Sequence, residues 1–361
     1  MERKEPNSGM LDLMIQPAFT VKDGVIDRVN EAARQYFLEA GTQIADLLLT
    51  GKSEYRELEE GCLYLTLSVS GLPCGASVRR IDGLDIFTIE QEADQSELQA
   101  MALAAQELRA PLSSVMAVAD RLFPVTDTDN DPVVQTQVSQ INRGLFQMLR
   151  VIGNMSDAYR YSQQTETKMV VMNVTSFMEE IFQQSAELLR HGGTELCFTN
   201  LEQTVFSLAD REKLERAVHN IISNAVKFAQ KGSRIDARLS RRNNMLYLTV
   251  QDSGNGIAQE VRSNVHSRFR RQPGLEDNRF GIGLGMVMIR SAASAHGGTV
   301  LIDHPEGCGT RLTMSMAIQQ DTDSMLRAST LQVDYAGERD HTLIELSDIL
   351  PSFLYASKKI N

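Results

Sequence analysis

The sequence predicts a multidomain α+β protein built from a small α/β module, an antiparallel helical hairpin, an α/β sandwich and a short C-terminal extension. Two observations support this fold class. Apolar residues alternate at intervals of three and four over residues 93–162, which is a helical period, whereas the flanking segments mix strand-like runs with turns. The 361 residues, 42% of them hydrophobic, are enough for two or three compact domains.

Residues 10–92 are expected to form the small module. The run "FTVKDGVIDRVN" indicates a β-hairpin, because Asp-Gly between two strand-like runs favours a tight turn. The run "NEAARQYFLEA" predicts a helix that Asn30 caps. Three further strands are predicted at "GCLYLTLSVSG", "GASVRRI" and "LDIFTIEQ". A hairpin, a helix and a three-stranded run together make a compact α+β unit.

Residues 93–162 are predicted to form two helices with a heptad seam. The first seam consists of Leu98, Met101, Ala105, Leu108, Leu112, Val115, Ala119 and Leu122. After a turn-like segment, Pro132 suits the first turn of the second helix. The second seam consists of Val134, Val138, Ile141, Leu145, Met148, Ile152, Met155 and Tyr159. One hairpin buries only one seam, so we expect two copies to pair as a dimeric four-helix bundle. The alternative is a hairpin packed on its own domain.

Residues 165–318 are expected to form the sandwich. Two amphipathic helices are predicted at "SFMEEIFQQSAELLR" and "REKLERAVHNIISNAVKFAQ". Strands are predicted at "SRIDARLSRR", "MLYLTVQD", "GTVLIDHP" and "TRLTMSMAI". In the extension, residues 319–361, "LQVDYAGERDHTLIEL" is interpreted as a hairpin and "SDILPSFLYA" as a short turn or helix. The extension shows no chemical motif, which favours a docking role.

Composition excludes several classes of protein. The net charge is −11 and long basic runs are absent, which argues against direct binding of nucleic acid. The N-terminus leads into no signal-peptide core, and no apolar run approaches the roughly 20 residues that span a bilayer. The four cysteines are scattered, with no CxxC pair, which indicates reduced thiols. We therefore expect a cytoplasmic protein.

The run "HNIISNAVKF" places two amides and an ammonium on one helix face. Asn220, Asn224 and Lys227 are spaced at i, i+4 and i+7. An amide oxygen is a hard ligand and lysine supplies positive charge, so this face suits a metal ion and phosphate oxygens. Taken alone, the same pattern is an ordinary polar helix face.

Two further elements follow in the same domain. In "DSGNGI", Asp252 ends a strand and can accept a hydrogen bond from an exocyclic amine, while Gly254 and Gly256 let the backbone approach a flat ligand. Taken alone, this run is a common turn. The run "SRFRRQ" then brings Phe269 and Arg271.

The fourth element, "GIGLGMVMI", places glycines at the start of a helix. Gly281, Gly283 and Gly285 leave free N–H groups next to the positive end of the helix dipole, which is an anion site. It does not match a dinucleotide-binding fingerprint, because no strand–helix–strand unit with a following acidic residue surrounds it.

The order of the four elements resembles the ATP-binding domain of sensor histidine kinases, of the GHKL superfamily shared with gyrase and Hsp90. The resemblance covers residues 95–318. The run "QELRAPLSSV" on the first heptad helix resembles that family's H-box, in its dimerisation and phosphoacceptor (HisKA-like) hairpin. Residues 10–92 resemble a PAS sensor module.

The resemblance implies a role for each matching residue. Asn224 would coordinate Mg²⁺ with Asn220 close by, Lys227 would touch phosphate, and Asp252 would bind the adenine amine of ATP. The other implied nucleotide-binding residues are Gly254 and Gly256 at the base, Phe269, Arg271, and Gly281, Gly283 and Gly285 at the triphosphate, under a lid of residues 270–280. Gyrase-type hydrolases carry a catalytic glutamate at the position of Asn220, so its absence argues against fast hydrolysis.

Some histidines also depart from the pattern. His266 stands where the family has the first aromatic residue of its third box, and we interpret it as a solvated lid residue. His219 is expected to be a core or boundary residue rather than a phosphoacceptor.

The decisive departure lies in the H-box. Gln106 occupies the position of the family's phosphoacceptor histidine, and residues 93–162 contain no histidine. A carboxamide nitrogen is not a useful nucleophile, because its lone pair is delocalised. Glu107, the acidic neighbour that assists the acceptor, is present. Ala110 replaces the Thr or Asn that positions water for dephosphorylating a response regulator. Gln106 falls on heptad position b, so we expect it to be exposed.

Three functions remain open. We expect a dimer that binds Mg·ATP, does not phosphorylate its own hairpin, and regulates a partner kinase or response regulator by binding. Alternatively, it is an active protein-histidine kinase that phosphorylates the histidine of a related kinase in a heterodimer. An ordinary ATPase or serine kinase of the same superfamily is the third possibility, and the heptad hairpin argues against it.

Overall fold

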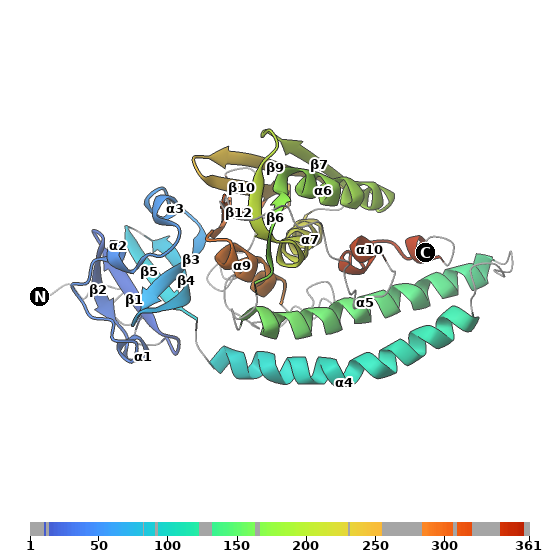
Figure 1. The fold of residues 1–361 in the computed structure, drawn as a ribbon, viewed down its shortest axis with the longest axis horizontal. Coiled ribbons are helices and arrows are strands. Elements are labelled where there is room, and N and C mark those ends of the chain that lie inside the picture. Colours follow the sequence, from blue (N-terminus) through green and yellow to red (C-terminus); the bar gives the residue numbers. More distant parts are fainter. Residues whose placement is uncertain are drawn as a thin grey trace, which may run out of the picture.

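The computed structural model describes residues 11, 14–81, 83–90, 93–122, 132–162, 167–229, 232–254, 284–305, 309–319 and 340–356. Figure 1 shows an N-terminal module at one end, two long helices running side by side, and a sheet with covering helices above them. We call residues 14–90 the N-terminal module, residues 169–319 the sandwich and residues 340–356 the C-terminal segment.

The N-terminal module contains the predicted hairpin and the three predicted strands, whereas the helix predicted over residues 30–40 is shorter and ends at Arg34, and two further short helices were not predicted. Its elements are β1 (Ala18–Lys22), β2 (Val25–Val29), α1 (Glu31–Arg34), α2 (Ile44–Leu47), α3 (Lys52–Arg56), β3 (Cys62–Val69), β4 (Leu72–Ile81) and β5 (Leu84–Ile89). Asp23 and Gly24 have positive φ angles of 52° and 79°, as a tight hairpin turn requires. The predicted cap is confirmed, since Asn30 Oδ1 accepts hydrogen bonds from the N–H groups of Ala33 (2.8 Å) and Ala18 (3.0 Å).

The sheet of the N-terminal module continues into the sandwich. Its strand order is β2-β1-β5-β4-β3, and β3 then pairs antiparallel with β11 (Val300–Asp303). The two sheets therefore form one ten-stranded sheet, which the sequence did not predict. Along β3 nearly every side chain is buried, so both faces of the strand and its free edge need cover. Pairing with β11 covers this edge at residues 62–64, and further along the N–H groups of Leu49 and Thr50 donate to the Thr66 carbonyl oxygen.

The predicted heptad helices are confirmed as α4 (Ala93–Leu122) and α5 (Pro132–Ser162). The two halves of each seam differ in burial. On α4 the a positions, such as Ala105 and Leu112, are buried against α5. The d positions Leu108, Val115 and Leu122 are 49%, 54% and 66% exposed. The same division recurs on α5, where Val138, Leu145 and Ile152 are buried and Ile141 and Met148 are exposed. One chain therefore leaves half of each seam uncovered.

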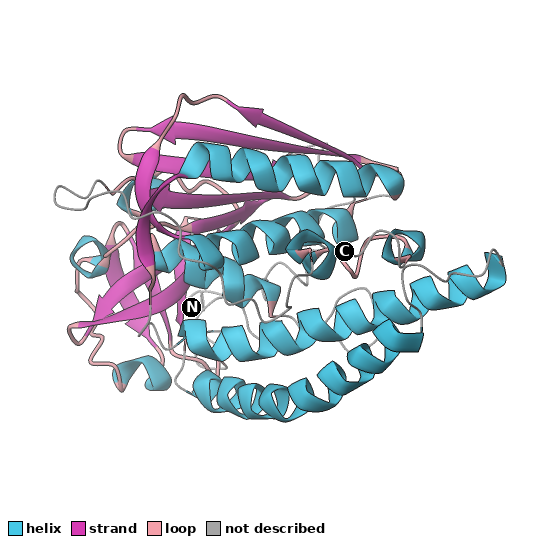
Figure 2. Ribbon diagram, turned by 45° about the vertical axis from the view of Figure 1, so that its right-hand side comes forward, coloured by secondary structure: helices cyan, strands magenta, loops and turns pink. Residues whose placement is uncertain are grey.

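In the sandwich, helices cover one face of the sheet (Figure 2). Its elements are β6 (Met169–Asn173), α6 (Val174–His191), β7 (Glu195–Asn200), β8 (Phe206–Asp210), α7 (Arg211–Phe228), β9 (Arg234–Arg242), β10 (Met245–Gln251), α9 (Gly285–Ala295), β11 and β12 (Arg311–Ala317). Both predicted helices and all four predicted strands are confirmed. Along β9, Ile235, Ala237 and Leu239 are buried, and the residues between them are exposed.

The C-terminal segment corrects one expectation. The run 331–346 was expected to be a hairpin, but His341–Glu345 is a helix, α10, and residues 331–339 lie outside the described part. Asp340 Oδ1 caps α10 by accepting from the Thr342 N–H at 2.8 Å. Four consecutive residues, 342–345, are buried, which a helical turn wedged between other helices permits and an edge hairpin does not. The predicted short helix is confirmed as the 3₁₀ helix Ser352–Tyr355.

The buried, hydrogen-bonded ring of His296 should make the stability of the fold depend on pH. Its Nε2 accepts the Asp210 N–H at 2.9 Å, so Nδ1 carries the proton and donates to the Ala292 carbonyl at 2.7 Å. Burial lowers the pKa of His296, and protonation of Nε2 would break the first bond. Below about pH 6.5 the unfolded chain binds this proton more readily than the folded one, so the free energy of unfolding falls as the pH falls. Urea unfolding at a series of pH values should show a weaker slope for His296→Gln, but not for His191→Gln at an exposed site.

The buried environment of His219 confirms the sequence interpretation. The residue is 1% exposed on α7 and its Nδ1 lies 2.9 Å from the Glu215 carbonyl oxygen. Burial lowers the pKa of His219, so the ring is a neutral core group at physiological pH.

Candidate nucleotide site

The polar face of α7 forms the floor of the candidate site. Asn220 is buried, and its Nδ2 donates to the Arg216 carbonyl oxygen at 2.8 Å, which directs its Oδ1 toward the start of α9. A Cβ at Gly285 would lie only 2.9 Å from that oxygen, so glycine permits the close approach of α9. The half-buried Asn224 makes no hydrogen bond to the described residues, which leaves its amide oxygen available to a metal ion.

Asp252 lies just beyond the end of β10, and its carboxylate is held on one side. Its Oδ1 accepts hydrogen bonds from the N–H groups of Gly254 (2.8 Å) and Thr310 (3.2 Å). Among the described residues, no donor reaches Oδ2. The residue is 4% exposed, and a ligand amine that reaches this second oxygen can donate a hydrogen bond to it.

Two glycines make room around this carboxylate. A Cβ at Gly254 would lie 2.4 Å from the Phe228 carbonyl oxygen, at the end of α7. A Cβ at Gly309 would lie 2.1 Å from Asp252 Oδ1. Any side chain at either position would displace the backbone, so the end of β10 can lie against α7 only with glycine there. The structure thereby brings Asp252 and Gly254 to the same helix as Asn220 and Asn224, a cradle that fits a base and its phosphates.

The remaining predicted residues cannot be placed. Gly256, Phe269, Arg271, Gly281, Gly283 and His266, together with the expected lid over residues 270–280, lie outside the described part of the chain. Their predicted roles therefore stay predictions.

Lys227 contacts a residue that the sequence interpretation missed. Its Nζ lies 2.8 Å from Asp348 Oδ2 of the C-terminal segment, and Arg150 Nη1 on α5 lies 2.5 Å from the same oxygen. Burial and the neighbouring Arg150 charge lower the pKa of Lys227, and Asp348 opposes them. No periodic signal in the sequence marks Asp348, because an ion pair between residues 121 positions apart has no local pattern.

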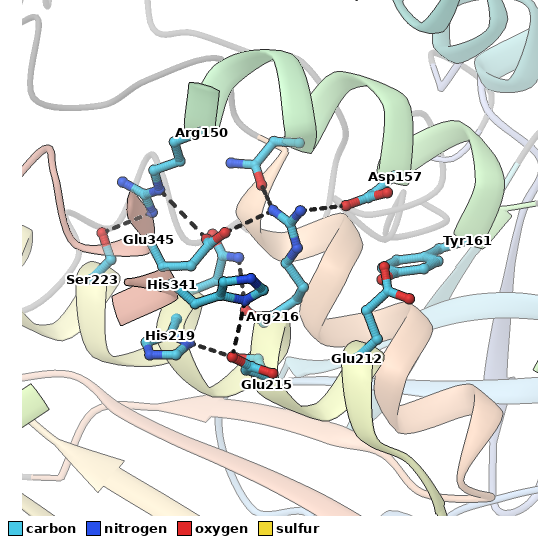
Figure 3. A network of polar contacts seen from close by, with 12 residues as sticks. Arg150, Asp157, Tyr161, Glu212, Glu215, Arg216, His219, Ser223, His341 and Glu345 are labelled. Carbon is cyan, nitrogen blue, oxygen red and sulfur yellow. Dashed lines mark hydrogen bonds and ion pairs between the residues drawn. The ribbon is translucent and has the colours of Figure 1, made fainter. Parts of the chain in front are cut away.

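A buried polar network joins α5, α7 and α10 beside this contact (Figure 3). Arg216 Nη1 lies 2.7 Å from Glu345 Oε1, and its Nη2 lies 2.7 Å from Asp157 Oδ2. Arg150 Nη2 donates to Ser223 Oγ at 3.1 Å. Burial raises the pKa of Asp157, and the guanidinium of Arg216 opposes that rise. The network fastens the hairpin and the C-terminal segment to the helix that carries Asn220 and Asn224.

Comparison with known proteins identifies the domain that carries these residues. Residues 209–320 match the family of histidine kinase-, DNA gyrase B- and HSP90-like ATPases. Over a longer stretch, the chain is similar to curated sensor histidine kinases. Its ATPase domain, of the GHKL class, is the sandwich described above.

Two curated histidine kinases illustrate the likeness. Histidine kinase P4 of Formosa agariphila is 25% identical over 234 residues, which are 63% of this chain and 17% of P4. The sensor histidine kinase RppB of Synechocystis is 26% identical over 240 residues, which are 65% of this chain and 52% of RppB. The matches therefore span at most about half the length of these two relatives.

A solved structure shows the shared fold. Full-length ShkA in complex with AMPPNP has a TM-score of 0.50 and 19% sequence identity to this chain, over 62% of this chain and 46% of ShkA. Among the described residues, we find no helix long and apolar enough to cross a membrane.

The position that the sequence comparison with an H-box assigned to the phosphoacceptor, Gln106, is open to solvent. Gln106 and Glu107 are exposed on α4, directly after the buried Ala105, which confirms the predicted exposure of position b. Ala110, one turn further along, is exposed as well. The helix thus presents Gln106 to any domain that approaches the hairpin, but the side chain it presents is not nucleophilic.

Proposed function

We propose that this chain is a cytoplasmic two-component signalling protein that binds Mg·ATP, does not phosphorylate its own hairpin, and regulates a partner histidine kinase or a response regulator by binding. One combination of features supports the proposal. The Asp252 carboxylate has an oxygen available to a base and Asn224 has an amide available to a metal ion, whereas the exposed acceptor position holds Gln106.

The described residues have distinct roles in this proposal. Asp252 Oδ2 accepts a hydrogen bond from the adenine amine while its Oδ1 stays fixed by two backbone N–H groups. Asn224 supplies an oxygen ligand to Mg²⁺ and Asn220 lies on the same face one turn away. Bound Mg·ATP would supply a transferable phosphoryl group, for which Gln106 is not an acceptor.

Substitutions in the cradle should weaken nucleotide binding. Asp252→Ala and Asn224→Ala should each raise the Kd for a non-hydrolysable ATP analogue with Mg²⁺ by about 10-fold or more, because a hydrogen bond to a charged group contributes about 1.5–3 kcal/mol. Isothermal titration calorimetry measures this change. Gln203→Ala, at an exposed loop position, is the control and should bind as the native chain does. A native chain that binds no nucleotide would contradict the proposal.

The hairpin supports a dimer. Leu108, Val115 and Leu122 on α4 are 49–66% exposed at regular heptad spacing, and an uncovered apolar stripe of this kind is typical of a coiled-coil partner surface. We infer that two hairpins, from two copies or from this chain and a related kinase, close a four-helix bundle. The N-terminal module, as a PAS-like sensor, would act on the bundle and on the sandwich through the β3–β11 pairing.

The dimer can be tested on the exposed stripe. Leu108→Glu should convert the protein to a monomer in size-exclusion chromatography with light scattering, because a charge at a d position cannot be buried without a partner. Leu103→Glu is the matched control, since Leu103 is 59% exposed on the same helix but lies at heptad position f, away from the stripe. Equal dimerisation of both variants would contradict the bundle.

The enzymatic alternative has a separate readout. If the chain is a protein-histidine kinase for a heterodimeric partner, labelled phosphate should appear on the partner's histidine and disappear with Asn224→Ala in this chain. The observation that favours this alternative is that Asn224 and Asp252 each keep an oxygen without a partner among the described residues.

A further inference from the structure

A cavity of about 310 Å³ lies where the N-terminal module, α5, α7 and α9 meet. Thr66 and Tyr64 line it from the module, Tyr161 from α5, Lys213 from α7, and Arg290 and Ser294 from α9. Its volume is at the lower end of the range of small-molecule pockets. It is separate from the cradle around Asp252, whose residues do not line it.

One cation in this cavity, Lys213, makes no ion pair with the described residues. Lys213 is 2% exposed, and within the described part of the chain its ammonium forms no hydrogen bond or ion pair. It lies over the Tyr161 ring, 5.1 Å from the ring centre. Burial lowers the pKa of Lys213. A buried ammonium is costly without a counter-charge, so the side chain favours an anion in the cavity.

The other cation that lines the cavity, Arg290, already has a carboxylate partner. Arg290 Nη1 lies 2.9 Å from Glu90 Oε1, and its guanidinium lies over the Tyr64 ring at 5.1 Å. Asp210 and Glu212 oppose the lowering of the Lys213 pKa only from beyond ion-pair distance. Among the described residues that line the cavity, Lys213 is thus a cation without a close carboxylate. A singly charged anion balances it, whereas a phosphate dianion does not.

The other residues that line the cavity indicate the chemistry of the rest of the ligand. Leu49, Val287 and Ala295 supply apolar surface, and the hydroxyls of Thr66 and Ser294 lie 3.4 Å apart at the junction of the module and α9. We propose that this cavity binds a small organic monocarboxylate with an apolar body, whose carboxylate pairs with Lys213. Such a ligand would contact the N-terminal module and also α7 and α9, the two helices that border the nucleotide cradle. Its binding would therefore couple the N-terminal module to the nucleotide site.

The full chain tests this site with benzoate as the probe. Calorimetric titration should show benzoate binding at millimolar or lower Kd, and the neutral isostere benzamide should bind at least about 10-fold more weakly. Lys213→Met should reduce benzoate affinity at least about 10-fold, and Lys52→Met, at an exposed lysine outside the cavity, should leave it unchanged. Ala295→Phe, which fills the cavity and removes no charge, should also abolish binding.

Three results would overturn the proposal: no benzoate binding up to about 10 mM, equal binding of benzamide, or benzoate binding that survives Ala295→Phe. If Lys213→Met does not fold, Ala295→Phe and the benzamide comparison still decide. Binding of inorganic phosphate in place of benzoate would likewise show that the assigned ligand class is wrong.

A second inference rests on an independent observation, the contact of Lys227 with the C-terminal segment. Arg143 Nε and Gln147 Nε2 on α5 both donate to the Ser347 carbonyl oxygen, at 3.1 and 3.2 Å. These bonds hold the segment so that Asp348 Oδ2 lies 2.8 Å from Lys227 Nζ. The Asp348 carboxylate is thus paired with the Lys227 ammonium, the group that the family resemblance assigns to phosphate binding.

We infer that the C-terminal segment is a tethered competitor of the nucleotide phosphates, with Asp348 as the competing anion. This inference rests on the proposed nucleotide site. A carboxylate carried on the same chain is present at a high effective concentration, so nucleotide phosphate must displace it from Lys227. Release of the segment would raise nucleotide affinity and also loosen the hairpin from α7.

Asp348→Asn tests the competition in the full chain. The Kd for the ATP analogue should fall about 3- to 10-fold, while the Kd for adenosine, which has no phosphate, should not change. The fall should disappear in the double variant with Lys227→Met. If the native chain binds no nucleotide, the proposed function fails, and this inference fails with it. If the native chain binds nucleotide and Asp348→Asn leaves its Kd unchanged, only the competition is wrong.

Discussion

Replacing Gln106 by histidine is expected to give the chain an autophosphorylation that its native sequence does not support. The position is exposed on α4, and the acidic Glu107 follows it. A neutral imidazole is nucleophilic, whereas the carboxamide of glutamine is not, so this one change restores the missing acceptor. Incubation of the Gln106→His variant with labelled ATP and Mg²⁺ should give a labelled protein whose label survives base and is lost in acid. The native chain, treated in the same way, should take up no label.

Two controls make this prediction specific. Gln99→His places an imidazole at the same heptad position one heptad earlier, on the same exposed helix face, and should stay unlabelled. The double variant Gln106→His with Asn224→Ala should lose the label, because it lacks the amide that we propose binds Mg²⁺. Label on the native chain's hairpin would contradict the claim that Gln106 prevents phosphorylation. A folded Gln106→His variant that binds ATP and takes up no label would show that more than the acceptor has been lost.

The sequence predicted those elements whose residues are close in the chain. The Asp23-Gly24 turn, the Asn30 cap and the heptads of both long helices each depend on a pattern within about ten residues, and the structure has all of them. The polar face of α7 was found for the same reason, since Asn220 and Asn224 are one helical turn apart.

The sequence did not predict contacts between distant segments. Glu345 and Asp348 are two acidic residues in an unremarkable tail, and only the fold brings them to Arg216 and Lys227. The helix α10 was missed for a related reason. Its alternating sequence matches a strand, but contacts with α5, α6 and α7 bury consecutive residues and so favour a helix. Likewise, Lys213 is an ordinary helix lysine until α5 and α9 bury it.

Replacing Arg216 by methionine is expected to destabilise the fold by about 3–5 kcal/mol, because removing one member of a buried ionic network leaves uncompensated charge. The Arg216 guanidinium is 5% exposed and lies 2.7 Å from both Glu345 and Asp157, which are themselves buried. Methionine fills a similar volume, so the loss reports on charge rather than on packing. Urea unfolding followed by circular dichroism measures the change, and its first effect should be release of the C-terminal segment from α7.

The matched control is Arg242→Met at an exposed pair. Arg242 and Glu57 lie 3.5 Å apart with side chains 72% and 70% exposed, and such surface pairs contribute about 1 kcal/mol or less. Adding Glu345→Leu to Arg216→Met should recover part of the lost stability, since it removes a buried carboxylate whose ion pair with Arg150 is long, at 3.8 Å, and Asp157 keeps Arg160 at 2.9 Å. If Arg216→Met costs no more than Arg242→Met, the network does not fasten the segment. In that case Asp348 is held at Lys227 by the bonds from Arg143 and Gln147 to the Ser347 carbonyl oxygen, and not by Arg216.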